Sequence, residues 1–178
     1  HLFQRHGLSI ADVERLQIHG GSLRVFARQE GAGTAESVRR LLAEEEEWGV
    51  DSTAFYETFG EKVKRLRRDL LGTLADLKAR GKRVAAYGAS AKGSTLLNYL
   101  GIGRETLDFV VDRSTVKQGY YTPGTHLPIY DPEKLLEASP DYVLLLTWNF
   151  EEEILEQQAE FRRRGGRFIV PIPEVRVV

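Results

Sequence analysis

The hydrophobic and polar positions of the chain follow two periods, one typical of helices and one typical of strands. Over residues 52–80 apolar side chains recur every three or four positions, which predicts one helix about 40 Å long. Short apolar runs then predict strands at 84–87, 107–111, 142–146 and 167–170, with helices near 132–138 and 150–163. The run at 142–146 is apolar throughout, as in a strand buried on both faces. The pattern therefore predicts an α/β protein with a Rossmann-like, mainly parallel sheet and flanking helices.

The first part of the chain has a different pattern. Two strand-like segments, 12–19 and 22–28, flank Gly20-Gly21, which predicts a β-hairpin with a two-residue turn. Leu23, Val25 and Ala27 alternate with other residues, so we expect one face of the second strand to be covered. An isolated hairpin is only marginally stable, and we expect a further sheet or a second copy of the hairpin to join it. A small-residue linker, 31–34, leads to a predicted helix at 37–48.

Composition narrows the function classes. The 178 residues are 42% hydrophobic and 29% charged, and the net charge of −1 argues against a nucleic-acid surface. The lack of cysteine excludes disulfides and thiolate metal sites, and the four histidines have no ligand spacing, so no metal is predicted. No apolar run approaches a membrane span and no signal peptide is visible, so we expect a cytoplasmic protein. The chain begins at His1 without methionine, as expected of a piece of a longer protein.

The loop after the strand at 84–87 is the main functional candidate. Gly88 and Gly93 keep two positions of the dinucleotide fingerprint, but Ser90 stands where the middle glycine belongs. The loop is not a Walker A loop either, because Ser94 follows Gly93 where a lysine is required, and Lys92 comes too early. A helix start with free N–H groups and one lysine favours a phosphate or carboxylate. The alternative is a small-residue turn that lets the helix pack against its strand.

Further candidates follow the second predicted strand. Asp112 lies where a dinucleotide fold places the acid that binds ribose hydroxyls, although a turn or cap role is an open alternative. The polar segment 112–126 is long enough to be a functional loop. Within it Lys117 and His126 are candidates to contact phosphate, and Tyr121 is a candidate to stack on a base. All three side chains also fit a purely structural role.

Trp148 and Asn149 follow the apolar strand at 142–146. Ligands of open α/β sheets bind at the carboxyl ends of the strands, so these two residues belong to the same rim as Ser90 and Asp112. A packed tryptophan at the end of a strand is the alternative.

Several motifs resemble the sugar C-methyltransferase family. The segments 7–8, 12–14 and 19–24 (His-Gly-Gly-Ser-Leu-Arg) are similar to the hairpin that closes the S-adenosylmethionine-binding domain of that family. Its C-terminal domain has signature runs similar to Tyr-Gly-Ala-Ser-Ala-Lys-Gly at 87–93, Lys-Gln-Gly at 117–119, Pro-Gly-Thr-His-Leu-Pro at 123–128, Pro-Asp-Tyr at 140–142 and Trp-Asn at 148–149. The resemblance covers nearly the whole chain.

The resemblance implies a three-part parent enzyme. It assigns residues 1–30 to the closing hairpin of the methyl-donor domain and residues 31–82 to a linker and helical segment. Residues 83–178 are assigned to a Rossmann-like domain that helps to bind a nucleotide sugar, typically a dTDP deoxysugar. The family's methyl-donor loop, zinc-ligating cysteines and Tyr/Glu/His catalytic run would all precede His1. We therefore expect no catalytic residue here, S-adenosylmethionine bound mainly by the preceding domain, and an inactive fragment. The implied reaction methylates a sugar carbon beside a ketone, after a base removes its proton to give an enolate.

Two other functions stay open. Gly88, Gly93 and Asp112 also suit an NAD(P)-binding oxidoreductase, although Ser90 breaks the fingerprint and no Ser-Tyr-Lys or His-centred catalytic set is visible. The third possibility is a non-catalytic assembly domain, in which the hairpin pairs with its copy in a homodimer.

Overall fold

The computed structural model describes residues 1–29, 31 and 33–178. The chain forms two compact units, His1–Lys62 and Val63–Val178. Glu30 and Ala32, which fall at the end of the predicted hairpin segment and in the predicted linker, lie outside the described residues. This division does not test the assignment of residues 1–30 to a methyl-donor domain, which stays a prediction.

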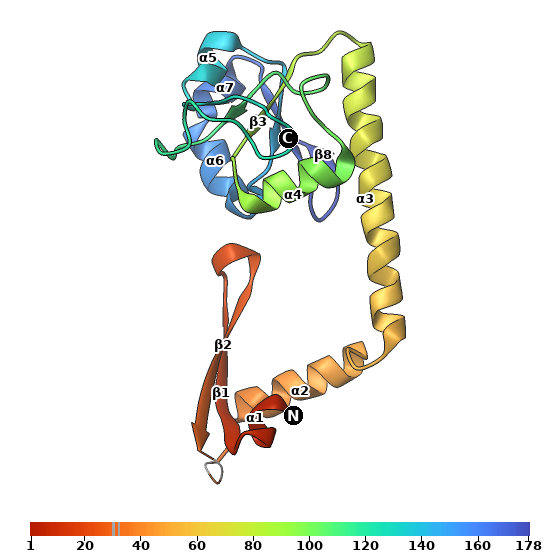
Figure 1. Ribbon diagram of the computed structural model, residues 1–178, viewed down its shortest axis with the longest axis vertical. Coiled ribbons are helices and arrows are strands. Elements are labelled where there is room, and N and C mark those ends of the chain that lie inside the picture. Colours follow the sequence, from red (N-terminus) through yellow and green to blue (C-terminus); the bar gives the residue numbers. More distant parts are fainter. Residues whose placement is uncertain (30, 32) are drawn as a thin grey trace. The chain divides into compact units, whose positions relative to one another are not determined.

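The first unit is built on a two-stranded antiparallel sheet (Figure 1). Its elements are α1 (Leu2–Arg5), β1 (Leu8–Leu16), η1 (Ile18–Gly20), β2 (Ser22–Gln29) and α2 (Glu36–Trp48). The predicted two-residue turn is wrong, because Leu16 pairs with Ser22 and five residues connect the strands. His19, Gly20 and Gly21 have φ values of 55°, 83° and 109°, so three successive residues with positive φ form the longer loop. Strand β1 begins at Leu8, earlier than predicted, and has a bulge between Ile10 and Asp12.

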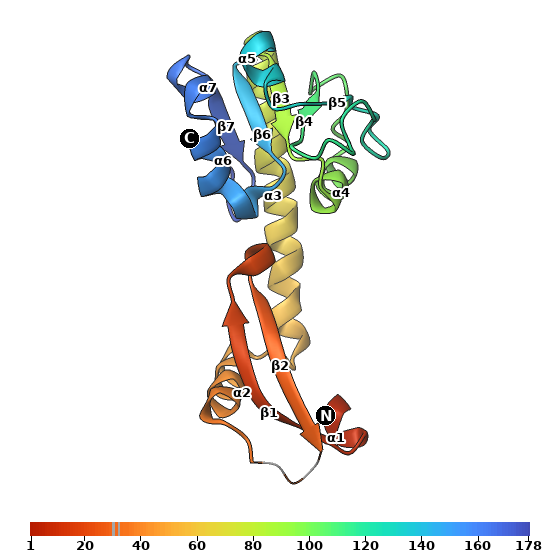
Figure 2. The ribbon, with the colours of Figure 1, turned by 90° about the vertical axis from the view of Figure 1, so that its left-hand side faces the viewer.

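Helix α2 covers only part of the hairpin (Figure 2). Ala11 of β1 and Val38 of α2 are buried, and the N–H of Ala35 donates to the carbonyl oxygen of Ala11 over 2.8 Å. Strand β2 is exposed instead, with Leu23 at 45% and Val25 at 38% of their full exposure. The predicted covered face of this strand is therefore not found among the described residues.

Helix α3 (Thr53–Ala79) matches the predicted long helix and crosses the division between the two units. The predicted apolar stripe comprises Phe55, Phe59, Val63, Leu66, Leu70, Leu74 and Leu77. Its C-terminal part is buried at Leu70, Leu74 and Leu77, whereas Phe59 is 66% exposed. The helical period thus predicted the helix correctly but not how much of its stripe is buried.

The second unit contains a six-stranded sheet in the order β5-β4-β3-β6-β7-β8, parallel except for β8. The strands are β3 (Val84–Tyr87), β4 (Val110–Val111), β5 (Ile129–Tyr130), β6 (Tyr142–Leu145), β7 (Arg167–Val170) and β8 (Arg176–Val177). The helices are α4 (Ala91–Leu100), α5 (Lys134–Ala138), η2 (Trp148–Phe150), α6 (Glu151–Gln157) and α7 (Ala159–Arg163). The predicted Rossmann-like α/β fold is confirmed, and its strand order reverses between β3 and β6.

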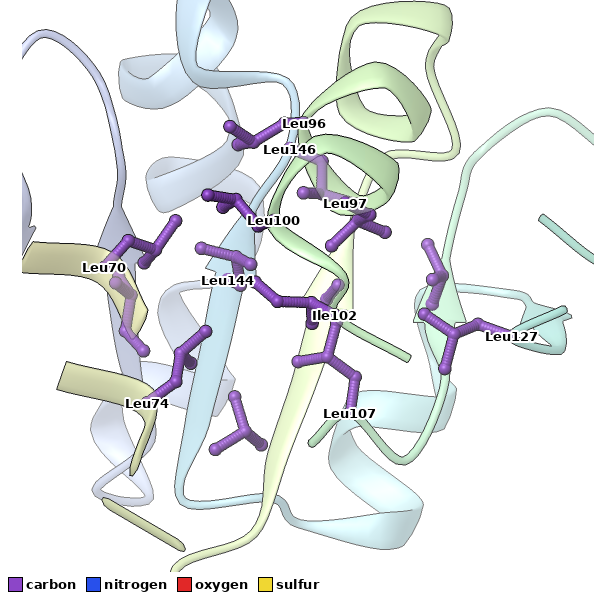
Figure 3. Packing of buried hydrophobic residues seen from close by; sticks show 14 of the residues in the cluster. Leu70, Leu74, Leu96, Leu97, Leu100, Ile102, Leu107, Leu127, Leu144 and Leu146 are labelled. Atoms are coloured by element: carbon purple, nitrogen blue, oxygen red, sulfur yellow. The ribbon is translucent and has the colours of Figure 1, made fainter. Parts of the chain in front are cut away.

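Buried side chains occupy both faces of this sheet. One face packs against α3 and α4, where Leu70, Leu97 and Leu144 are among the residues that converge (Figure 3). The other face packs against α5, α6 and α7 through residues such as Ile154 and Phe168. Figure 1 shows these two sets of helices on opposite sides of β3. Each fully buried leucine stabilises the fold by about 1.5–3 kcal/mol.

The remaining differences concern short elements. Strand β4 spans two residues where five were predicted, although Asp108 and Phe109 also bond to β3: the N–H of Asp108 donates to the carbonyl oxygen of Val84 and the carbonyl oxygen of Phe109 accepts from the N–H of Ala86, both at 2.9 Å. The predicted helix at 150–163 is interrupted at Gln158, whose ψ of 25° is not helical. Strands β5 and β8, each two residues long, were not predicted.

Candidate functional site

The loop from Gly88 to Ser90 connects the end of β3 to the start of α4. Ser90 is the N-cap of α4, and its Oγ accepts a hydrogen bond from the N–H of Gly93 at 3.0 Å. The N–H groups of Ala91 and Lys92 donate to no described residue. With the positive end of the helix dipole, these two N–H groups suit an anion.

Lys92 links this helix start to the segment that follows β6. Its Nζ lies 2.9 Å from Oδ1 of Asn149 and 5.2 Å from the centre of the Trp148 ring. The fold therefore brings three predicted site residues together across the point where the strand order reverses. Asn149 is a neutral partner, so it leaves the positive charge of Lys92 uncompensated.

Asp112, at the end of β4, connects the glycine loop to the loop that follows. Its carboxylate accepts hydrogen bonds from the N–H of Ala89 at 2.7 Å, the N–H of Ser114 at 2.8 Å and Nζ of Lys117 at 3.2 Å. The side chain is mostly buried, which strengthens these charge-assisted bonds. This geometry favours the turn role over ribose binding.

The loop after Asp112 is held by hydrogen bonds that the sequence did not reveal. Nε2 of Gln118 donates to the carbonyl oxygen of Asp112 at 3.0 Å and to Oδ2 of Asp131 at 3.1 Å. Oγ1 of Thr122, a buried hydroxyl, accepts from the N–H of Leu127 at 2.9 Å. A Gln and a Thr are common in loops, and nothing in their spacing indicated these roles.

A cavity of about 500 Å³ opens between this loop and the start of α4. We name it the helix-start cavity; its lining consists of Ala89, Ser90, Ala91, Ser94, Val116, Lys117, Tyr120, Tyr121, Pro123 and Ile129. Tyr120 and Tyr121 are 68% and 57% exposed, so their rings are accessible for stacking. Tyr120 was not predicted as a site residue, although it adjoins Tyr121.

His126 does not line the helix-start cavity. Its N–H donates to the carbonyl oxygen of Thr122 at 3.0 Å, and this turn places His126 beside Arg104 and Asn98, in a different depression of the surface. The carbonyl oxygen of His126 accepts from Nε of Arg104 at 2.9 Å. The other nine predicted residues lie on the glycine loop, in the first turn of α4, at or in the loop after β4, or after β6.

A second cavity, of about 560 Å³, lies at the ends of β3, β4 and β6. We name it the hydroxyl cavity; its lining consists of Tyr87, Gly88, Asp112, Arg113, Ser114, Thr147, Phe150, Glu153 and Ile154. Gly88 has a φ of 98°, and a Cβ there would lie 2.5 Å from Cγ2 of Thr147. Glycine is therefore required at position 88 by conformation and by space.

Burial raises the pKa of the Tyr87 phenol, and the positive charge of Arg113 opposes this shift in part. The phenol is therefore neutral near pH 7 and able to donate a hydrogen bond.

Among residues 1–29, 31 and 33–178, no group of acidic and histidine side chains has the arrangement of a metal site. Within the same residues no helix is long and apolar enough to cross a membrane.

Comparisons with known proteins identify the family. A curated relative, the C-methyltransferase NovU of Streptomyces niveus, is 42% identical over 179 aligned positions, which cover 99% of this chain and 43% of the relative. A solved structure, UDP-D-quinovosamine 4-dehydrogenase from Vibrio fischeri, matches 55% of this chain and 93% of its own, with a TM-score of 0.39 and 21% identity. That similarity is too low to bear on function. The family model described as "C-methyltransferase C-terminal domain" matches residues 17–173, so the chain belongs to this family.

Proposed function

We propose that this chain is the C-terminal part of an S-adenosylmethionine-dependent C-methyltransferase that acts on a nucleoside-diphosphate keto-deoxysugar, with dTDP as the nucleotide. Its role is to bind the nucleotide sugar. The observation that carries the proposal is the start of α4, where the N–H groups of Ala91 and Lys92 have no partner among the described residues. The relationship to the C-methyltransferase NovU supports the reaction class, and the chain spans less than half of that relative.

The diphosphate binds at the helix-start cavity in this proposal. One phosphate accepts hydrogen bonds from the N–H groups of Ala91 and Lys92, where the helix dipole stabilises a negative charge by about 0.3–1 kcal/mol. Lys92 does not line this cavity; its ammonium lies beside Asn149 at the same helix start, where it adds a full positive charge with no acidic partner among the described residues. Lys117 contributes less, because Asp112 already neutralises it.

The exposed side chains of Tyr120 and Tyr121 also line this cavity. Sugar rings and bases pack on aromatic faces, so these tyrosines are suited to the uncharged part of the nucleotide sugar. Trp148, whose ring lies 5.2 Å from Nζ of Lys92, is a positioning residue for that side chain in this proposal.

The helix-start cavity does not suit S-adenosylmethionine, whose sulfonium is a cation, because the α4 start and Lys92 both favour anions. We therefore place the cofactor in a preceding domain of the parent enzyme and assign no catalytic step to this chain. The oxidoreductase alternative is disfavoured because Asp112, the expected ribose acid, already accepts three hydrogen bonds.

The test is a calorimetric titration of the 178-residue chain with dTDP, NAD and S-adenosylmethionine. We expect dTDP to bind and the Lys92→Ala variant to bind it about tenfold more weakly, since a hydrogen bond to a charged group contributes about 1.5–3 kcal/mol. Lys78→Ala is the matched control, because it removes the same charge from the last turn of α3. That turn precedes the start of β3, whereas the glycine loop and Lys92 follow the end of β3. Equal dTDP affinity of the wild type and Lys92→Ala, or binding of NAD alone, would refute the proposal.

A further inference from the structure

Arg104, which follows the end of α4, contacts the polar loop after β4 at two points. Its Nε donates to the carbonyl oxygen of His126 at 2.9 Å, and its Cζ lies 5.6 Å from the centre of the Tyr121 ring. A guanidinium at this distance from an aromatic ring is attracted to the face of the ring and is suited to stack on it. One side chain therefore holds both the backbone of this loop and its tyrosine ring.

Asn98, in the last turn of α4, holds the same loop at a third point. Its Nδ2 donates to the carbonyl oxygen of Pro123 at 3.0 Å and to that of Ser94, in its own helix, at 2.8 Å. Gly124 has a φ of 80°, and a Cβ there would collide with Oδ1 of Asn98, so the loop backbone lies directly on this amide. The loop is thus fixed to the C-terminal end of α4.

The turn at 122–126 needs such contacts because of its backbone. His126 has a φ of 52°, in the left-handed region that residues with a side chain rarely adopt. Such a conformation persists only where neighbouring contacts maintain it. Here the N–H of His126 donates to Thr122, and its carbonyl oxygen accepts from Arg104. The Arg104 bond therefore helps to maintain the turn that follows Tyr121.

This loop borders two cavities. Tyr121 and Pro123 line the helix-start cavity, whereas residues 124–126 line a depression of about 620 Å³. Arg104 lines the depression and not the helix-start cavity. Any contribution of Arg104 to a ligand in the helix-start cavity therefore passes through the loop or through long-range charge alone.

We propose that Arg104 is a positioning residue that holds the Tyr121 ring at the wall of the helix-start cavity before a ligand binds; this inference rests on the proposed function. Tyr121 is 57% exposed, so without Arg104 its ring is free to sample several rotamers. Ordering such a side chain on binding lowers affinity. A ring that a guanidinium already holds on one face keeps its other face ready for the uncharged part of the nucleotide sugar.

The test is a double-mutant cycle of Arg104→Ala and Tyr121→Ala, with calorimetric titrations of dTDP and inorganic pyrophosphate into the 178-residue chain. We expect Arg104→Ala to weaken dTDP about two- to tenfold, the effect of one side chain that must be ordered, and to leave pyrophosphate unchanged. In the Tyr121→Ala background the Arg104 substitution should weaken dTDP no further. Arg80→Ala is the matched control, because it removes the same charge from an exposed arginine that follows α3.

Two results of this cycle would overturn the inference. The first is that Arg104→Ala weakens dTDP and pyrophosphate equally, and the second is that it weakens dTDP as much without the Tyr121 ring as with it. In either case Arg104 acts through its charge and not by positioning the ring.

A measurement without ligand separates this inference from the proposed function. The ¹³C relaxation of the Tyr121 ring should show a more mobile ring in Arg104→Ala than in the wild type. An equally rigid ring would overturn the inference whether or not dTDP binds. If the ring becomes more mobile but dTDP does not bind the wild type, the proposed function fails, and the nucleotide role of Arg104 fails with it.

Discussion

Replacing Gly93 by alanine tests whether the glycine loop is shaped by packing as well as by ligand binding. Gly93 is the third residue of α4, and a Cβ there would lie 2.7 Å from Cβ of Leu146 and 3.2 Å from Oγ of Ser90. Leu146 is 1% exposed, and its Cβ is fixed by the backbone that continues β6. The contact is too short for any rotamer change of Leu146 to relieve, so helix and strand must separate.

Two opposing effects set the size of the change. Alanine in a helix interior is favoured over glycine by about 0.5–1 kcal/mol. Overpacking a close contact costs about 1–3 kcal/mol, and the immovable Cβ of Leu146 places Gly93→Ala in the upper half of that range. We expect a net loss of about 1–2.5 kcal/mol in the free energy of unfolding.

Gly72→Ala is the matched control, because Gly72 lies in α3 of the same unit and a Cβ there would meet nothing within 4 Å. This variant should gain about 0.5–1 kcal/mol. Urea unfolding followed by circular dichroism measures both changes. A Gly93→Ala variant as stable as wild type, or stabilised like Gly72→Ala, would show that the close approach of α4 to β6 is not real.

Two further predictions concern carboxylates. Asp112→Ala should lower the free energy of unfolding by about 2–4 kcal/mol, because three donors lose a charged acceptor, and Asp112→Asn should lose less in the same urea assay. The hydrogen bonds from Lys82 and the N–H of Arg83 hold the pKa of Asp141 below its usual value. This contribution to stability is complete above pH of about 4 and is lost as the pH falls through the lowered pKa. Asp141→Asn should therefore flatten the loss of stability on acidification, and an unchanged pH profile would contradict this assignment.

The sequence was informative where one side-chain pattern repeats over several turns or along a fully buried strand. The long helix and strands β3, β6 and β7 have such patterns, and their positions were predicted closely. Strands β5 and β8 have two residues each, too few to show a period. Leu107 illustrates a different limit, because it is buried although the backbone bonds to β3 begin only at Asp108, so an apolar run can extend beyond the paired backbone.

In the candidate site, too, local features could be predicted from the sequence and tertiary contacts could not. Ser90 and Lys92 were predicted from local features of a helix start, and the fold brings Lys92 to Asn149 although 57 positions separate them in sequence. Tyr87 and Thr147 were not predicted, because whether a buried hydroxyl has a partner depends on tertiary contacts that no local pattern contains. His126 was grouped with the site by its position in a loop, and the turn at Thr122 directs it elsewhere.

The central claim is that the start of α4 binds the diphosphate of a nucleotide, and the most direct measurement is a ¹H–¹⁵N NMR titration of the chain with dTDP. The free N–H groups of Ala91 and Lys92 report binding at the proposed atoms themselves. We expect these two amides to shift most, pyrophosphate to move them in the same direction, and Lys92→Ala to weaken both effects. If dTDP leaves both amides unmoved, or shifts only residues far from α4, the diphosphate does not bind at the start of α4.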